Sequence, residues 1–333
     1  MTPFKLTDEL LAEIEQLVEQ QQDARLLSIL DDVHYADVAE IANELEVDQA
    51  TYLIKLLESD KTSDILTELD DDVREAILNN LSSKEIAGEL GELDTDDAAD
   101  IVAELPDEIV QEVISEIEDR EHAQAIVDLL RYDENSAGGL MAKELVKVNE
   151  NWNVLTCVKE MRAQAENVTR VHSIYVVDDQ DVLKGRLSLK DLLTTSTTAP
   201  IKDVYIPKVD SVNVNENPEE VARIMSKYDL EAIPVVDELG RLVGRITIDD
   251  IVDVIQDEAD RRVMAPAGLD EEEDIFAPVF RTSRSRAVWL GVNLITAFIA
   301  ATVIGRFQET ISGLVALAVL MPVAVSYTHL RAH

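Results

Sequence analysis

The sequence predicts a multidomain protein: an all-α superhelical domain, then a duplicated α/β region, then α-helical transmembrane segments. Three observations predict this order. Leucine or isoleucine recurs every twelve residues through the first third of the chain. A later segment aligns with itself at an offset of 59 residues, and an uncharged run of 19 residues follows nearer the end.

The twelve-residue repeat predicts short helices. Most repeat positions follow an apolar pair three or four residues earlier, which is helical spacing. In one continuous helix each step would turn the apolar stripe by about 120°, so no single face could be buried. Breaks at the polar turns 58–60, 70–72 and 94–96 remove this problem, and stacked short helices then share one core. We expect a superhelical domain over residues 1–130. The repeat positions are Leu45, Leu57, Leu69, Leu81, Leu93, Leu105, Ile117 and Leu129.

The charge of the chain is strongly negative. It has 68 acidic and 29 basic residues, a net charge of −39, and residues 1–130 alone carry 37 acids and 7 bases, a net of −30. Such a surface repels phosphate backbones, so we expect no nucleic-acid partner. The acids either form a solubilising surface or bind divalent cations, and their arrangement has to decide between the two. A single cysteine, Cys157, excludes an internal disulfide.

The duplicated region reads as two copies of one α/β unit. Residues 174–192 align without gaps with residues 233–251. Each copy reads as strand, helix, strand, turn, strand and helix. This resembles a tandem pair of CBS domains, with the first unit at 131–198 and the second at 199–256.

In CBS domains the pattern Gly-x-x-Ser/Thr-x-x-Asp often contacts an adenine nucleotide. The glycine admits close approach of a backbone, the hydroxyl bonds phosphate and the carboxylate bonds ribose hydroxyls. The alternative is that the two hydroxyl residues only cap the helices that follow. The residues in question are Gly185, Ser188 and Asp191 in the first unit and Gly244, Thr247 and Asp250 in the second.

The last part of the chain predicts a membrane domain. We expect a connecting helix or linker at 257–280 and the start of the transmembrane domain at 281–325. Its first span, Ala287–Gly305, is long enough for a bilayer core of about 30 Å, and a second covers about 310–325. Arginines at 281, 284 and 286 precede the first span. They place the amino-terminal half in the cytoplasm of a multi-pass protein of the cell (inner) membrane.

The final residues, 326–333, interrupt the second apolar run. They introduce two histidines and an arginine where hydrocarbon is expected. We expect them to be an artefact of sequencing or assembly joined at about Val325, with the natural membrane domain, and its pore residues, continuing beyond that point.

The order of these parts resembles the MgtE family of magnesium channels. Its most specific segments are Tyr132–Met141 and Leu314–Val323. The resemblance implies magnesium transport by a homodimer in the lipid bilayer. It also implies that intracellular Mg²⁺, bound between the cytoplasmic domains, holds the pore shut. ATP or another adenine nucleotide is the second ligand that the CBS pair suggests.

The resemblance also implies where sensor Mg²⁺ would bind. In one group, acids of the helical domain face the CBS region: Asp64, Asp96 and Asp100 opposite Gly138, Gly139 and Asp250. A second group lies between the CBS region and the connecting helix: Glu219, Asp229, Asp253 and Glu258. Asn217 and the pair Arg261-Arg262 stand where the family can have acids, which leaves fewer carboxylates for the second group. Shared carboxylates with retained water suit Mg²⁺, which prefers six oxygen ligands.

The sequence supports two other classes of function less well. A CBS-domain sensor of adenine nucleotide without transport activity would leave Ala287–Gly305 dispensable. An enzyme lacks support, because the sequence has no glycine-rich phosphate loop, no serine or cysteine paired with histidine in a known pattern and no zinc-ligand spacing. We therefore predict that the protein is not an enzyme.

Overall fold

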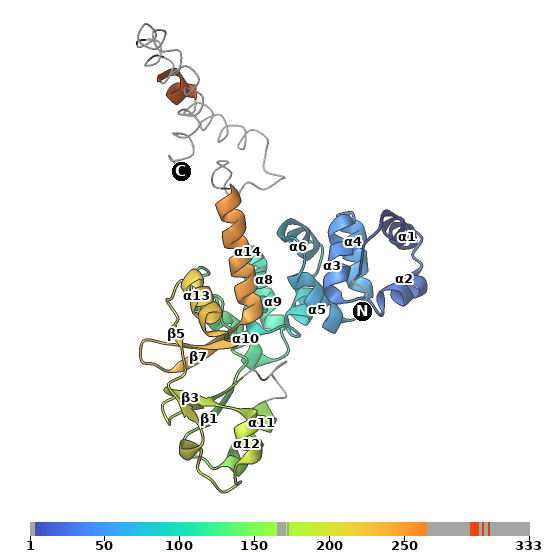
Figure 1. The fold of residues 1–333 in the computed structure, drawn as a ribbon. Coiled ribbons are helices and arrows are strands. Elements are labelled where there is room, and N and C mark those ends of the chain that lie inside the picture. The colour runs from blue at the N-terminus through green and yellow to red at the C-terminus, as the bar shows by residue number, and fades with distance from the viewer. Residues whose placement is uncertain are drawn as a thin grey trace. The chain divides into compact units, whose positions relative to one another are not determined.

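The computed structural model describes residues 4–164, 171, 173–264, 294–299, 302 and 306. The chain divides into two compact units, Met1–Val252 and Asp253–His333, and each is described by itself. The first unit begins with helices alone and continues with strands and helices (Figure 1).

The described residues before the first strand form ten helices of 8 to 12 residues. They are α1 (Asp8–Glu19), α2 (Asp23–Leu30), α3 (Tyr35–Glu44), α4 (Val47–Leu56), α5 (Ser59–Thr67), α6 (Asp71–Leu78), α7 (Ser83–Leu90), α8 (Thr95–Glu104), α9 (Asp107–Glu116) and α10 (Arg120–Leu129). The prediction of an all-helical domain made of short helices is confirmed. Helices α5, α6 and α8 begin inside the three polar turns that the sequence singled out.

The twelve-residue repeat marks helix ends. Leu45, Leu105 and Ile117 are each the residue that caps a helix at its C-terminus, and all three are buried. Leu57 caps α4 in the same way but is only half-buried. Contacts then skip one helix: α3 contacts α5, α5 contacts α7 and α7 contacts α9, while α4 contacts α6 and α8 contacts α10. Each helix from α3 to α10 thus contacts a next-but-one neighbour, while α1 contacts α2 and α4.

Residues beyond α10 form two small sheets with their helices, as the α/β prediction requires. The first sheet has the order β1-β2-β3-β4 and the second β5-β6-β7. In chain order the elements begin with β1 (Val146–Asn149), α11 (Val154–Gln164), β2 (Ile174–Val177), β3 (Leu183–Leu187), α12 (Leu189–Thr194) and the 3-10 turn η2 (Ile201–Asp203). Then follow β4 (Ile206–Pro207), β5 (Val212–Asn213), α13 (Pro218–Tyr228), β6 (Ala232–Val236), β7 (Leu242–Thr247) and α14 (Ile248–Met264).

In both sheets a parallel pair of strands is joined to an antiparallel pair. β1 runs parallel to β2 and β2 antiparallel to β3, and the same relation holds for β5, β6 and β7. The hairpin turns of the two units contact each other: Leu183 N donates to Gly240 O at 3.0 Å and Leu242 N donates to Asp181 O at 2.9 Å. Gly240 and Asp181 are 59 residues apart, and both adopt positive φ. The duplication is therefore also a duplication of backbone conformation.

The edge of each antiparallel pair accepts a segment that precedes the other unit. β3 pairs with β4, and β7 forms an antiparallel bridge from Arg245 to Ala142. Glycine makes both approaches possible. A Cβ on Gly185 would overlap the carbonyl oxygen of Ile206, and one on Gly244 would lie 2.7 Å from Met141 Sδ and 2.8 Å from Ala142 O.

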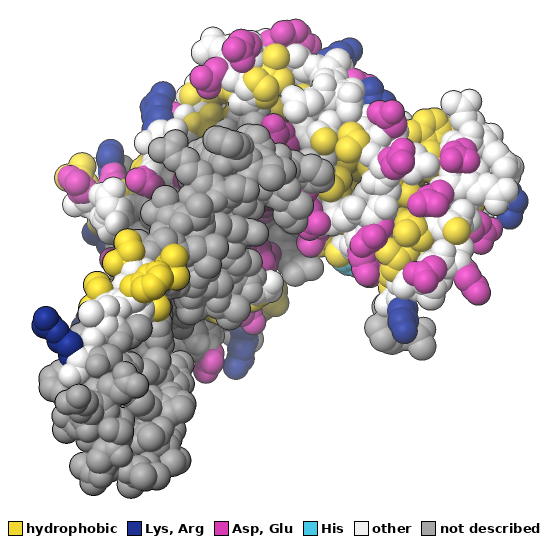
Figure 2. All heavy atoms as spheres, turned by 90° about the horizontal axis from the view of Figure 1, so that it is seen from above, with side chains coloured by type: hydrophobic (Ala, Val, Ile, Leu, Met, Phe, Trp, Pro, Cys, Tyr) yellow, Lys and Arg dark blue, Asp and Glu magenta, His cyan; other side chains and the backbone are white. Residues whose placement is uncertain are grey.

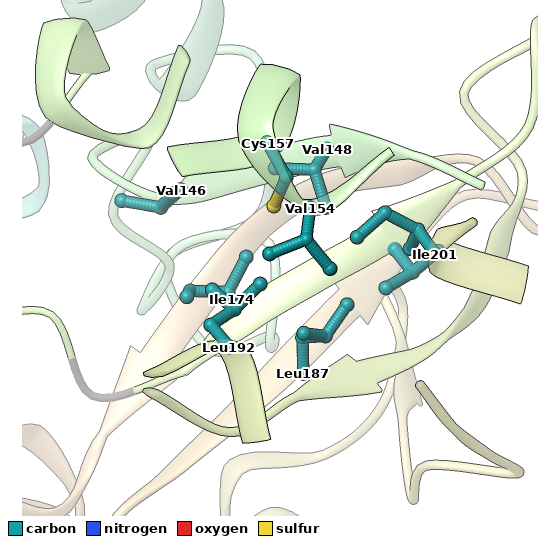
Figure 3. Packing of buried hydrophobic residues seen from close by; sticks show 9 residues of the cluster. Val146, Val148, Val154, Cys157, Ile174, Leu187, Leu192 and Ile201 are labelled. Carbon is teal, nitrogen blue, oxygen red and sulfur yellow. The ribbon is translucent and has the colours of Figure 1, made fainter. Parts of the chain in front are cut away.

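The core of the first CBS-like unit lies between its sheet and its helices. The strand residues Val146, Ile174 and Leu187 pack against Val154 and Cys157 of α11, and Leu192 of α12 and Ile201 complete the cluster (Figure 3). Cys157 is buried, and burial raises the pKa of its thiol to about 11. Its role is therefore packing, like that of its valine neighbours.

The predicted membrane spans fall largely outside the described residues. Of Ala287–Gly305, only 294–299 and 302 are described, as helix, and 310–325 lies outside altogether. Among the described residues, no helix has the length and apolar character needed to cross a membrane. The artefactual tail predicted at 326–333 also lies outside the described residues.

Candidate functional site

Helix α8 brings three carboxylates toward the second CBS unit. Asp96, Asp97 and Asp100 lie in its first two turns. Asp250 lies in the first turn of α14, directly after β7. The charge of Asp250 acts on all three α8 carboxyl groups, which places the four acids around one junction.

Burial and mutual repulsion raise the pKa of these acids. Burial comes first for Asp96, followed by the charges of Asp250 and Asp97, and its pKa lies well above the usual range. Burial, followed by the charges of Asp250 and Asp100, raises the pKa of Asp97 to about 7. Burial, then Glu134 and Glu104, raise that of Asp100 to about 7. The Asp100 side chain is nevertheless solvent-exposed, so water screens its shift more than that of buried Asp96.

Asp250 is held in place by Thr247. The backbone N and the hydroxyl of Thr247 both donate to Asp250 Oδ2, at 2.9 and 2.7 Å. These hydrogen bonds lower the pKa of Asp250, but burial outweighs them and raises it to about 6. Thr247 thus orients the Asp250 carboxylate through one of its oxygens, Oδ2.

The donor atoms of this set are of the kind that a divalent cation prefers. The donors are carboxylate oxygens, which Mg²⁺ prefers. Their pKa values are raised first by burial and then by the charges of neighbouring carboxylates, and Arg245 opposes this rise at Asp250. A bound Mg²⁺ would relieve the repulsion between α8 and α14. Of the predicted ligands of the first group, Asp96 and Asp100 both lie within electrostatic reach of Asp250.

Asp64 and Gly139 border the same junction. The half-buried Asp64 of α5 has a raised pKa because of burial and the charges of Asp60 and Asp94, so it lies within electrostatic reach of the start of α8. Gly139 belongs to the segment after α10, where Gly138 N donates to Val214 O at 2.8 Å. A Cβ on Gly139 would lie 2.6 Å from Glu134 O. The segment that carries both glycines is therefore fixed against the residues that follow β5.

The second predicted group of ligands falls on separate elements. Glu219 lies in the first turn of α13 and Asp229 caps its C-terminus with positive φ, and both are exposed. Asp253 and Glu258 lie on the part of α14 that belongs to the compact unit Asp253–His333. A magnesium site formed by this group stays a prediction.

The two nucleotide-binding patterns have different surroundings. In the first unit, Ser188 Oγ accepts a hydrogen bond from Lys190 N at 3.2 Å, so it caps α12, and Asp191 is half-buried. In the second unit Thr247 is buried and bonded to Asp250, which faces α8. The close approaches at Gly185 and Gly244 are made by protein segments. Ser188 therefore caps α12, and nucleotide binding at either unit stays a prediction.

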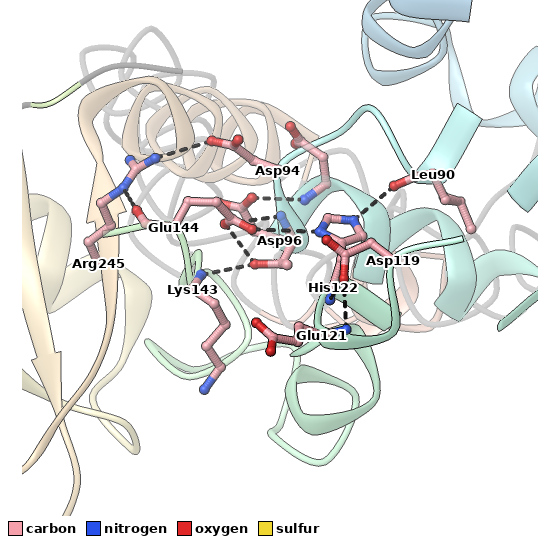
Figure 4. Close-up of polar contacts among 11 residues, drawn as sticks. Leu90, Asp94, Asp96, Asp119, Glu121, His122, Lys143, Glu144 and Arg245 are labelled. Carbon is pink, nitrogen blue, oxygen red and sulfur yellow. Dashed lines mark hydrogen bonds and ion pairs between the residues drawn. The ribbon is translucent and has the colours of Figure 1, made fainter. Parts of the chain in front are cut away.

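The sequence did not single out a network at the start of α8 (Figure 4). Asp94, Asp96 and Glu144 have carboxylate oxygens within 4.8 Å of one another. Arg245 contacts Asp94 at 3.1 Å, and Thr95 donates to Glu144 Oε2 from its backbone N at 3.2 Å and from its hydroxyl at 2.8 Å. The polar turn 94–96 was the one part of this network that the sequence indicated. Neither Glu144 nor Arg245 differs from its neighbouring residues in a way that predicts these contacts.

Comparison with known proteins gives the family. The family described as MgtE intracellular N domain matches residues 33–135, and the CBS domain family matches 137–197 and 201–257. The magnesium transporter MgtE of Bacillus subtilis is 30% identical over 323 residues, which cover 96% of this chain and 71% of that protein. The chain belongs to the MgtE family of magnesium transporters. This confirms the resemblance drawn from the sequence.

Other MgtE proteins match over a shorter part of this chain. The magnesium transporter MgtE of Thermus thermophilus is 35% identical over 197 residues, or 59% of this chain and 44% of that protein. A crystal structure of the cytosolic domain of the Mg²⁺ channel MgtE in complex with ATP is 34% identical. It covers 73% of this chain and 99% of its own, with a TM-score of 0.67. The chain thus spans less than half the length of some MgtE relatives that it matches. The relatives named here are transporters or channels rather than enzymes.

Proposed function

We propose that this chain is the magnesium-sensing region of a magnesium transporter together with the start of its membrane domain. In this proposal Mg²⁺ binds between α8 and the start of α14 and keeps the transporter closed when the ion is abundant. The observation that supports it is that the charge of Asp250 acts on Asp96, Asp97 and Asp100, although Asp250 comes from a distant part of the chain.

The physical basis is repulsion that a cation removes. Two like charges about 4 Å apart repel by roughly 1 kcal/mol in water and roughly 4 kcal/mol at an effective dielectric constant of 20. Acidic side chains are also spread over the visible described surface in Figure 2, with fewer basic ones among them. Without Mg²⁺ the junction between α8 and α14 is therefore destabilised. Binding of Mg²⁺ shifts the population toward the closed junction, which is the coupling a sensor requires.

The test is protection of the junction segment by Mg²⁺. We expect trypsin cleavage of the detergent-solubilised chain at Arg131 and Lys143 to slow about tenfold in millimolar Mg²⁺, in line with common coupling energies. NaCl at equal ionic strength should give a small part of this effect, because screening lacks coordination. Asp100→Asn should blunt the response, and Asp48→Asn, at an exposed position of α4, should not. Equal protection by Na⁺ and Mg²⁺ would rule out the sensor.

A second candidate function is binding of an adenine nucleotide. A relative 34% identical to this chain was crystallised in complex with ATP. The first CBS unit supports such binding here, because half-buried Ser188 and Asp191 leave oxygens that a nucleotide could reach. The second unit supports it less, since Asp250 is bonded to Thr247 and faces the acids of α8. We therefore expect one nucleotide per chain, at the first unit.

The CBS units also support a homodimer. Equivalent positions of the two units, 59 residues apart, expose apolar side chains: Leu189 and Ile248 are 44% and 40% exposed, and Leu193 and Val252 are 84% and 43% exposed. Within each helix the two positions are four residues apart and thus lie on one face. We propose that these faces of α12 and α14 meet the same faces of a second copy.

Membrane insertion completes the proposal. MgtE relatives are magnesium transporters, and the uncharged run Ala287–Gly305 supports a first span, with the amino-terminal half in the cytoplasm. A protease site placed after residue 280 should then be cut only in opened cells. Cutting in intact cells would contradict this orientation, and a chain that stays soluble would favour the nucleotide sensor without transport.

A further inference from the structure

Helix α8 carries a stripe of carboxylates along one face. Asp97, Asp100 and Glu104 follow one another at spacings of three and four residues, so their side chains project from the same side of the helix. The charge of Asp250 acts on the first two, whereas Glu104 is the last residue of α8. Within the described part of the chain, Glu104 is the one member of this stripe that forms an ion pair.

The partner of Glu104 is Arg74 of α6. Arg74 Nε donates to Glu104 Oε2 at 2.9 Å and Nη2 donates to Glu104 Oε1, so both carboxylate oxygens are engaged. Arg74 Nη1 donates to the carbonyl oxygen of Leu69 at 3.1 Å, and Nη2 also contacts Asp71 Oδ1 at 2.7 Å. The side chain of Arg74 is 12% exposed, whereas that of Asp71 is 93% exposed and screened by water. Glu104 is therefore the carboxylate that fixes the guanidinium.

Asp100 lies one helical turn from this pair. It precedes Glu104 by four residues, and the charge of Arg74 acts on its carboxyl group. The other charges that act on Asp100 are negative, those of Glu134 and Asp250 among them. A guanidinium released from Glu104 would therefore be attracted to Asp100, where it could engage both carboxylate oxygens in the same way. It would then occupy the oxygens that Mg²⁺ needs.

We propose that Glu104 is a positioning residue of the magnesium site: it holds the guanidinium of Arg74 and thereby keeps it from pairing with Asp100. This inference rests on the proposed function, in which Asp100 binds Mg²⁺. Arg74 and Glu104 both belong to the helical domain, so their contact does not depend on the junction between α8 and α14. The pair adds no net charge beside Asp100 and leaves that carboxylate open to the ion.

The two sides of the pair give different expectations, which separates positioning from mere support of α8. In Glu104→Gln the guanidinium loses its carboxylate, turns to Asp100 and competes with Mg²⁺. In Arg74→Gln no guanidinium remains, so Asp100 stays open. A pair that only stabilised the fold would change the Mg²⁺ response in the same direction when broken from either side.

The experiment is a Mg²⁺ titration of trypsin cleavage at Arg131 and Lys143 in the full chain in detergent, starting from EDTA. We expect the Mg²⁺ midpoint for protection to rise about fivefold in Glu104→Gln, the competition that a partly exposed charge pair can exert. The midpoint should not rise in Arg74→Gln. In the double variant Arg74→Gln/Glu104→Gln it should return to within about twofold of the unaltered value, because the competing cation is gone.

Glu13 provides a matched control in the same domain. It pairs with Arg25 at 3.4 Å, between α1 and α2, so Glu13→Gln also releases an arginine from a carboxylate. The Mg²⁺ midpoint of this variant should be unchanged, since neither residue lies on α6 or α8. Mass spectrometry identifies the junction fragments, and far-UV circular dichroism checks that each variant is folded.

The outcomes separate this inference from the proposed function. An unchanged midpoint in folded Glu104→Gln, or a raised one in the double variant, would refute the positioning role and leave the sensor in place. Arg74→Gln keeps the test independent of folding at Glu104, because a raised midpoint there would refute the role by itself. If Mg²⁺ protected the junction in no chain, the sensor would fail and this inference with it.

Discussion

The two CBS units carry the same residues at equivalent positions and use them differently. Arg186 is exposed, whereas Arg245 is buried and reaches Asp94 of the helical domain. Asp191 is half-buried, whereas Asp250 is bonded to Thr247 and surrounded by the acids of α8. Neither the glycine nor the acid of the repeated pattern explains this difference. It arises because the second unit is the one that α8 and the segment after α10 contact.

A duplicated fold can therefore separate two functions that begin with one motif. The first unit keeps its pattern near solvent, where a nucleotide can reach it. In the second unit the same pattern forms part of an acidic junction, which suits a cation. Changes made in pairs, one in each CBS unit, test this division directly. The exposed apolar faces of α12 and α14 provide a contrast, because there the two units are expected to act alike.

The largest effect is expected where the two units act alike, in association. Leu193→Glu should weaken the proposed homodimer by on the order of 100-fold in Kd, because each of two copies loses a leucine whose burial contributes about 1.5–3 kcal/mol. Val252→Glu should act in the same direction but less strongly, since less of its side chain is exposed in the single chain. Sedimentation velocity of the detergent-solubilised chain measures this. A dimer unaffected by either change would place the interface elsewhere.

The next effect concerns the two close approaches at glycine. Gly185→Ala should lower the free energy of unfolding by about 3 kcal/mol, because its methyl group would overlap the backbone oxygen of Ile206. Gly244→Ala should cost about 2 kcal/mol, since the side chain of Met141 can give way in part.

Gly88 is the matched control, because it lies inside α7 with nothing within 4 Å of its added Cβ. Gly88→Ala should raise the free energy of unfolding by up to about 1 kcal/mol. Urea unfolding followed by circular dichroism gives all three values. A harmless Gly185→Ala would show that β4 does not pair with β3 as described.

A smaller effect follows from the acids of the junction. The folded-state pKa is raised to about 7 for Asp97 and Asp100 and to about 6 for Asp250, above the ordinary value of 3.8. The folded state therefore binds more protons than the unfolded state between about pH 3.8 and pH 7. In EDTA the free energy of unfolding should fall as pH rises from 6 to 8, by on the order of 2 kcal/mol once the exposure of Asp100 is discounted.

Variants and Mg²⁺ separate this effect from general titration. Asp97→Asn should remove about half of the slope, and Asp191→Asn, in the first unit, should leave it as it is. Saturating Mg²⁺ should flatten the slope, because a bound cation keeps the carboxylates ionised. Urea unfolding at pH 6, 7 and 8 is the measurement, and a free energy that rises with pH would contradict the described packing of α8.

Local patterns predicted the fold well and the junction only in part. The twelve-residue repeat predicted helix ends because a buried leucine followed by a polar turn is a local signal, and Leu105 caps α8 as that signal requires. Asp96, Asp100 and Asp250 were named through the family resemblance. Arg245 and Glu144 were not, because nothing in the neighbouring residues distinguishes Arg245 from Arg186. Their role depends on contact between segments far apart in the sequence, and that information resides in packing.

The smallest effect tests whether the nucleotide belongs to the first unit alone. Asp191→Asn should weaken ATP binding about tenfold, the cost of about 1.4 kcal/mol expected when a charged hydrogen-bond acceptor for ribose becomes neutral. Asp250→Asn should change the affinity less than twofold, because Asp250 Oδ2 already accepts from Thr247 and its surroundings are acidic, which repels phosphate. Isothermal titration calorimetry with ATP, in EDTA and then in Mg²⁺, measures both. The same two variants should show the opposite order in the Mg²⁺ protection assay, where Asp250→Asn loses a ligand and Asp191→Asn loses nothing. If both changes weakened ATP binding equally, the two units would share the nucleotide, and the division of function between them would have to be abandoned.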